Sequence, residues 1–129
     1  MAPEPQGQKR QYNRFRVVLP LKYRLLSSPA GDPPENDFHN SHNLIYDLSL
    51  GGFLLSSKNF LEEGALLEVE FVMEKLGKTY RGQALVVRAN NFNYPEQGRF
   101  EYGLQFKDPE PAFRGLLDSF VKSLAQDVP

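Results

Sequence analysis

The stretch that decides the fold class runs from residue 67 to residue 89 and reads LEVEFVMEKLGKTYRGQALVVRA. Residues 67–74 alternate, and the apolar set is Leu67, Val69, Phe71 and Met73. An alternation with a period of two is typical of a half-buried β-strand. The segment KLGK at 75–78 supplies a hairpin turn, and residues 79–89 return as the partner strand, with a bend or bulge expected at Gly82. A hairpin of this length predicts a mainly β fold.

Shorter segments carry related patterns. Residues 15–25 alternate between apolar and polar side chains, and Pro20, which has no N–H to donate, places this strand at an edge, a bulge or a bend. Residues 44–46 and 53–55 predict two short strands joined by a tight connection. Residues 101–106, EYGLQF, predict one more strand, whose apolar face consists of Tyr102, Leu104 and Phe106. These segments extend the β structure over most of the chain.

The last element is predicted to be a helix over residues 109–126. Apolar residues recur there at intervals of three and four: Phe113, Leu116, Leu117, Phe120, Val121 and Leu124. One apolar stripe at this spacing indicates an amphipathic helix. Asp108 is a suitable N-cap and Pro109 suits the first helical position. We expect the apolar stripe to pack on the β structure that precedes it.

Two segments have no apolar periodicity. Residues 1–9, MAPEPQGQK, contain Pro, Gly and Gln, and we expect them to form a disordered leader. Residues 27–43 are longer than most connections within a domain, and we expect them to lie on the surface and to move. His39 and His42 stand there at HxxH spacing, but no helix aligns them and no cysteine is nearby, so we assign no metal.

Composition bounds the class of protein. The chain has 129 residues and a mass of 14.7 kDa, which suits one domain. Because it contains no cysteine, neither a disulfide framework nor a thiolate metal site is proposed. The sequence has no apolar run that suits a signal peptide or a membrane span. We therefore expect a cytoplasmic protein without membrane insertion.

The net charge of −1 conceals an asymmetry. Residues 5–31 carry six Lys or Arg and no acidic residue, and the rest of the chain carries nine basic and sixteen acidic residues. A basic segment on an acidic protein directs small anions to one place without attaching the whole surface to DNA, so no DNA partner is expected. Charged runs are also typical of solvated tails, so charge alone does not assign a site.

Two short motifs carry more specific chemistry. RQYNR at 10–14 places Arg10 and Arg14 four residues apart, and DLSLGG at 47–52 provides a carboxylate, a hydroxyl and two glycines. Arginine bonds the O6 and N7 atoms of guanine, clamps phosphate or stacks on a purine, and a carboxylate accepts from guanine N1 or N2. Taken alone, DLSLGG is also ordinary turn chemistry. Turn formation, however, does not require the two arginines.

The two motifs together resemble the ligand motifs of the PilZ domain family, RxxxR followed by [DN]xSxxG, and every specified position is filled. GQALVVR at 82–88 and EYGLQF also look like later strands of that family. The resemblance implies a six-stranded antiparallel β-barrel with a C-terminal α-helix packed on it. It also implies a stand-alone domain over residues 10–126, with the barrel at about 15–107 and the helix at about 109–126.

The same resemblance implies a receptor for the bacterial second messenger cyclic di-GMP, with no further cofactor. The implied site consists of Arg10 and Arg14 as base and phosphate contacts, Asp47 and Ser49 as polar contacts, Gly51 or Gly52 as the position where the backbone approaches the ligand, and Lys9 and Arg16 as secondary candidates. The RxxxR segment is expected to close over the ligand and signal to a partner protein, in a setting of motility or biofilm regulation.

Two other functions stay open at this point. A PilZ-type module can work through protein contacts alone, although the intact arginines argue against that role. A small β-barrel can instead bind single-stranded nucleic acid through exposed aromatic rings beside positive charge, and Tyr12 and Phe15 are candidates for such rings. An enzyme is not expected, because the sequence has no Ser/His/Asp order, P-loop or zinc-binding motif.

Overall fold

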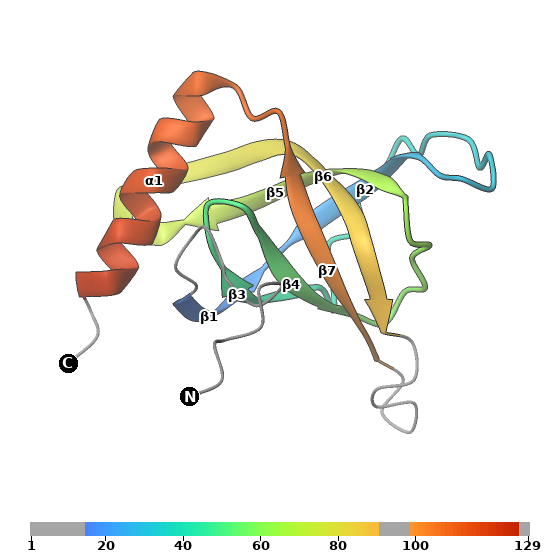
Figure 1. Cartoon of the computed structure of the whole chain (residues 1–129), viewed down its shortest axis with the longest axis horizontal. Coiled ribbons are helices and arrows are strands. Elements are labelled where there is room, and N and C mark those ends of the chain that lie inside the picture. The colour runs from blue at the N-terminus through green and yellow to red at the C-terminus, as the bar shows by residue number, and fades with distance from the viewer. Residues whose placement is uncertain (1–14, 91–98, 127–129) are drawn as a thin grey trace, which may run out of the picture.

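The computed structural model describes residues 15–90 and 99–126, which form one antiparallel sheet and one helix (Figure 1). The seven strands lie in the order β1-β3-β4-β7-β6-β5-β2. Their bounds are β1 Phe15–Pro20, β2 Lys22–Ser27, β3 Leu44–Leu48, β4 Gly52–Ser57, β5 Leu66–Met73, β6 Lys78–Asn90 and β7 Phe100–Lys107. A short 3-10 helix, η2 Glu74–Leu76, joins β5 to β6, and α1 Pro111–Gln126 ends the described chain. The predicted mainly β fold with a C-terminal helix is confirmed.

The sheet curls because its two edge strands are neighbours in the chain. β1 pairs with β3 and β2 pairs with β5, and Leu21 alone separates β1 from β2. Residues 15–25, predicted as one strand, are therefore two strands on opposite edges, so the sheet has seven strands instead of six. Pro20 ends β1, as expected of a residue without an N–H. Leu21 is buried, and its N–H donates to the carbonyl of Asn43 at 3.0 Å.

The core lies inside the curl. The four apolar side chains predicted for one face of β5 are all buried, as are the three predicted for β7. Tyr80 of β6 lies between two of them, with ring centroids 5.1 Å from Phe71 and 5.1 Å from Phe106. Gly82 is regularly paired with Val69, so the predicted bulge there is wrong. A Cβ at Gly82 would lie 2.8 Å from the Tyr80 hydroxyl oxygen, which explains the glycine.

The helix α1 covers one end of the curled sheet (Figure 1). Leu117, Phe120 and Val121 are buried against the core, as the apolar stripe predicted. The helix begins at Pro111, two residues later than predicted. The predicted N-cap, Asp108, instead adopts a left-handed backbone with φ of 43°, which turns the chain out of β7 before the helix starts.

The 27–43 loop runs back along the outer edge of β2. The Tyr23 N–H donates to the carbonyl of His39 at 3.2 Å, and the His39 N–H returns a bond of 2.7 Å to the carbonyl of Tyr23. Further along, the Leu25 N–H donates to Glu35 Oε1 at 2.8 Å and the Glu35 N–H donates to the Leu25 carbonyl at 2.9 Å. The loop thus covers an edge that is otherwise open to pairing with another chain. Its expected mobility stays a prediction.

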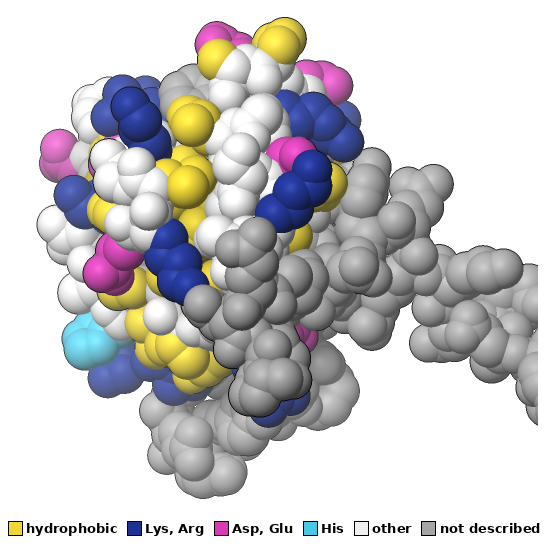
Figure 2. All heavy atoms as spheres, turned by 90° about the vertical axis from the view of Figure 1, so that its left-hand side faces the viewer, with side chains coloured by type: hydrophobic (Ala, Val, Ile, Leu, Met, Phe, Trp, Pro, Cys, Tyr) yellow, Lys and Arg dark blue, Asp and Glu magenta, His cyan; other side chains and the backbone are white. Residues whose placement is uncertain are grey.

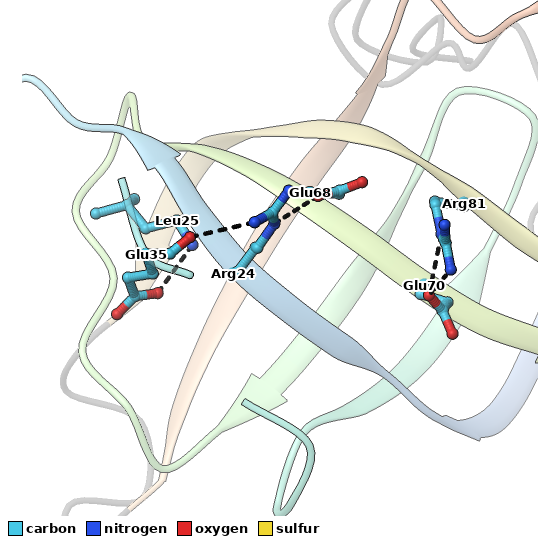
Figure 3. A network of polar contacts seen from close by, with 6 residues as sticks. All are labelled: Arg24, Leu25, Glu35, Glu68, Glu70 and Arg81. Atoms are coloured by element: carbon cyan, nitrogen blue, oxygen red, sulfur yellow. Dashed lines mark hydrogen bonds and ion pairs between the residues drawn. The ribbon is translucent and has the colours of Figure 1, made fainter. Parts of the chain in front are cut away.

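Arg24 of β2 bonds both the 27–43 loop and the neighbouring strand β5 (Figure 3). Its Nε donates to Glu68 Oε1 on β5 at 2.6 Å, and its Nη1 donates to the Glu35 carbonyl at 3.4 Å. The guanidinium carbon also lies 5.4 Å from the centre of the Phe38 ring. One side chain therefore links the loop to the sheet.

In the described parts of the chain, no helix is long and apolar enough to cross a membrane. Nor do these residues bring together three or more His, Cys, Asp or Glu side chains that could hold a metal ion.

Candidate functional site

Ser49 lies in the turn between β3 and β4 and is only 7% exposed. Its Oγ accepts the N–H of Gly51 at 3.1 Å and that of Gly52 at 3.3 Å. The Ser49 N–H donates to the Gly52 carbonyl at 2.9 Å and closes the turn. The hydroxyl therefore stabilises the turn, which is the first of the two roles that the sequence left open for it. Contact of Ser49 with a ligand stays a prediction.

Gly52 lies where β4 meets β7. A Cβ at this position would overlap the carbonyl oxygen of Leu104, so the pairing of the two strands excludes any side chain. The neighbouring Gly51 accepts the N–H of Phe106 through its carbonyl at 3.0 Å. Both glycines thus allow the turn to pack against β7. Their close approach to a ligand stays a prediction.

Asp47 and Arg16 are cross-strand neighbours on β3 and β1. Both line a groove of about 510 Å³, here called the outer groove, which lies within the range of about 300–1,000 Å³ that small-molecule sites occupy. Its lining residues are Arg16, Val18, Tyr46, Asp47, Leu54, Ser56, Arg99 and Glu101. Within residues 15–90 and 99–126, no hydrogen bond occupies the Asp47 carboxylate. The structure therefore brings two predicted site residues to one groove, with the carboxylate available.

Arg99 and Glu101 form part of the outer groove and were not predicted. Arg99 is held by three bonds: its Nε donates to Ser56 Oγ at 2.7 Å, and its Nη2 donates to the carbonyls of Ser56 at 3.1 Å and His42 at 3.0 Å. The alternation in EYGLQF already places Glu101 opposite the core-facing Tyr102, which is a signal the sequence contains. Arg99 has no such signal, because its position depends on β4 pairing with β7.

A smaller hollow of about 300 Å³ continues the outer groove toward β6. It shares Leu54 and Glu101 with the groove and adds Arg88 and Gly103. The Arg88 guanidinium lies against Gly103, since a Cβ on that glycine would be 3.3 Å from Arg88 Nη2. This arginine was also not predicted. It gives the far end of the groove a cation with a planar face suited to stacking or bidentate bonding.

Lys9, Arg10 and Arg14 lie outside the described residues, so their predicted roles stay predictions. The described chain begins at Phe15, immediately before Arg16 of the outer groove. β1 starts on the side of the molecule where α1 lies (Figure 1). The face on that side shows a run of hydrophobic side chains bordered by Lys and Arg side chains (Figure 2). In the sequence, the RxxxR motif ends two residues before Arg16, and β1, which carries Arg16, starts beside a surface that is both apolar and cationic.

Together these features define a small β-barrel domain with a C-terminal helix at one end and a surface groove, lined by charged, polar and apolar side chains, that includes Arg16 and Val18 of β1. The family model described as PilZ domain matches residues 8–123. The chain belongs to the PilZ domain family, as the two motifs predicted. No curated protein matches the chain by sequence to a significant degree.

Solved structures show the same fold at low identity. The PilZ domain of YcgR from Escherichia coli with c-di-GMP is 20% identical, with a TM-score of 0.62 and coverage of 93% of this chain and 94% of that one. MotI/DgrA, an inhibitor of motility from Bacillus subtilis, is 18% identical, with a TM-score of 0.68 and coverage of 98% and 58%. The MrkH–c-di-GMP complex of K. pneumonia is 21% identical, with a TM-score of 0.68 and coverage of 93% and 54%. This chain thus spans little more than half the length of MotI and MrkH.

Proposed function

We propose that the protein is a non-enzymatic receptor for cyclic di-GMP. The observation that carries the proposal is the pairing of Arg16 with Asp47 in the outer groove, two residues after the RxxxR motif of a PilZ domain. The similar PilZ structures of YcgR and MrkH contain c-di-GMP, which supports the choice of ligand. The cytoplasmic location stays a prediction.

The chemistry of the outer groove suits a guanine nucleotide. The Asp47 carboxylate accepts from guanine N1 or N2, and arginine reads O6 and N7 or clamps phosphate. Three arginines, Arg16, Arg88 and Arg99, stand at intervals along the groove and its extension. Arg99 is already bonded to the protein, which leaves Arg16 and Arg88 as the exposed cations. Arg10 and Arg14 supply the remaining donors from the N-terminal side.

The signal would arise from closure of the N-terminal segment. Residues 9–14 directly precede β1 in the sequence, so bringing Arg10 and Arg14 onto a ligand beside Arg16 would involve only this short segment. The ligand, the closed segment and the sheet would then form one composite surface for a partner protein. A ligand-independent interaction module is the second candidate, and the available Asp47 carboxylate favours the receptor over it.

Titration calorimetry tests the proposal. Cyclic di-GMP should bind with a dissociation constant near micromolar, about −8 kcal/mol, and cyclic di-AMP and GTP should bind much more weakly, because adenine reverses the hydrogen-bonding pattern of guanine and GTP has one base. Asp47→Ala should weaken binding by about 1–2 kcal/mol. Asp37→Ala, an exposed acid outside the groove, is the matched control and should bind like the wild type. Equal affinity for the two cyclic dinucleotides would contradict the proposed specificity.

A further inference from the structure

A second hollow of about 800 Å³ lies between the 27–43 loop and the connection from β4 to β5. It shares no lining residue with the outer groove, and the loop that forms one wall is the one too long for an ordinary connection. We call it the loop groove and define it by the residues that carry its chemistry: Asp32, Pro33, Pro34, Lys58, Phe60 and Glu62. The proposed function makes no use of it.

The walls of the loop groove are fixed by a polar network. Both carboxylate oxygens of Glu35 lie 3.0 Å from His39 Nε2, and the His39 ring stacks on Tyr23 with centroids 4.7 Å apart. On the opposite wall, Asn59 Nδ2 donates to the Tyr23 hydroxyl at 2.9 Å, so the same tyrosine joins both sides. The groove is therefore formed before any partner arrives, which lowers the entropic cost of binding.

The loop groove contains exposed apolar side chains. Phe60 is 63% exposed although its ring is held edge-on against Phe100, with centroids 6.2 Å apart at 85°. Pro33 and Pro34 are exposed on the facing loop. A large aromatic ring held in one orientation beside two prolines presents apolar area at little conformational cost, which is the property of interface anchors.

The charges around this apolar surface are mostly negative. Asp32 Oδ2 accepts the Ser28 hydroxyl at 3.1 Å, and Glu62 Oε1 accepts the Ala30 N–H at 3.2 Å, so each carboxylate keeps a second oxygen for a partner. Glu35 is the third carboxylate of the groove, facing His39, and Lys58 is its single lysine or arginine. A nucleic acid would be repelled by this balance, whereas a Lys or Arg side chain would be attracted.

We propose that the loop groove docks a segment of a partner protein that places an aliphatic or aromatic side chain on Phe60 and basic side chains against Asp32 and Glu62. The apolar contact supplies the affinity and the charges select the partner. This docking does not depend on cyclic di-GMP, so it stands whether or not the receptor function does.

The test is a titration of ¹⁵N-labelled full chain, followed by NMR, with the peptide acetyl-GKLKFKLG-amide and its acidic analogue acetyl-GELEFELG-amide. The basic peptide should cause saturable shifts at the amides of Asp32, Glu35 and residues 58–62, and the acidic peptide should not. Phe60→Ser should weaken binding at least about tenfold. The double variant Asp32→Asn, Glu62→Gln, which keeps the acceptor oxygens of the loop, should also weaken it.

Val72→Ser is the matched control, because Val72 is an exposed apolar residue on β5 outside the groove, and it should leave binding unchanged. A folded spectrum for Phe60→Ser shows that the loss is local. Absence of saturable shifts at millimolar basic peptide, equal binding of the acidic analogue, or shifts spread over the rest of the surface would overturn the proposal.

Discussion

Asp47 and Ser49 are two residues apart, yet the structure gives them different roles. Ser49 is buried and its hydroxyl is bonded within the turn, whereas Asp47 is partly exposed and faces the outer groove. The motif DxSxxG thus combines a position that lines the outer groove with positions that build the turn. Gly52 belongs to the second group, since β7 excludes a side chain there.

Ser49→Ala should lower the free energy of unfolding by about 2 kcal/mol, because two backbone N–H groups lose their acceptor in a buried turn. Asp47→Ala should leave the stability nearly unchanged. Urea titration followed by circular dichroism measures both. A Ser49→Ala variant as stable as the wild type would show that the hydroxyl is not needed by the turn.

Among the elements, the hairpin of β5 and β6 was predictable and the first strand was not. Alternation in sequence reports which side chains are buried, and Leu67, Val69, Phe71 and Met73 are all buried. It does not report which strand a segment pairs with. Residues 15–25 keep one alternation through Leu21 while their two halves pair with β3 and β5, so only the tertiary structure divides them.

The 27–43 loop is a second element whose contacts the sequence did not predict. Its composition did not predict the backbone bonds to β2 and the Arg24 contacts that join it to the sheet (Figure 3). The hydrogen bond from the Leu25 N–H to Glu35 Oε1 joins two residues that no sequence pattern relates to each other. The loop groove therefore could not be predicted from the sequence.

Acid should loosen this loop. Burial opposes ionisation of Glu35, but hydrogen bonds from His39 and the Leu25 N–H outweigh it and hold the pKa of Glu35 below its usual value of 4.5. A carboxylate with a lowered pKa stabilises the fold above the unfolded-state pKa, and this contribution is lost as the pH falls through the folded-state pKa. The stabilisation should therefore be complete at neutral pH and be lost as the pH falls below 4.5 through the lowered pKa of Glu35.

NMR shifts of the Leu25 and His39 amides measure this loosening across a pH titration. Glu35→Gln removes the titrating group and should abolish the transition at these amides, whereas Asp37→Asn in the same loop should not. A transition that persists unchanged in Glu35→Gln would assign it to another group.

For the whole molecule, the sequence predicted the family, the fold class and two residues of the outer groove, Arg16 and Asp47, and no hydrogen bond within the described residues occupies the Asp47 carboxylate. It missed Arg88 and Arg99, because strands far apart in the sequence bring them to the groove. Charge asymmetry predicted a cationic N-terminal side, and Arg16 on β1 agrees with it. The motif can therefore be recognised in the sequence, but the full set of groove residues comes together only in the folded sheet.

For the whole molecule, we predict that the N-terminal segment closes over the ligand. Two charge-assisted contacts of about 1.5–3 kcal/mol each must offset backbone ordering of about 1–2 kcal/mol per residue, so affinity should be moderate and the change local. Amides of residues 6–16 should gain protection from hydrogen exchange when cyclic di-GMP is added. Arg14→Ala should abolish this gain and weaken binding at least about tenfold, while Arg81→Ala should do neither. Amides already protected in the free protein would contradict closure.

NMR titration of the ¹⁵N-labelled protein tests whether cyclic di-GMP binds in the outer groove. Saturating ligand should shift the amides of Arg16, Tyr46, Asp47, Leu54 and Glu101, which line that groove, and leave those of Asp32, Glu35 and residues 58–62 in place. Cyclic di-AMP at the same concentration should produce small shifts at most. No saturable shift with cyclic di-GMP, or shifts confined to residues outside the outer groove, would contradict the account.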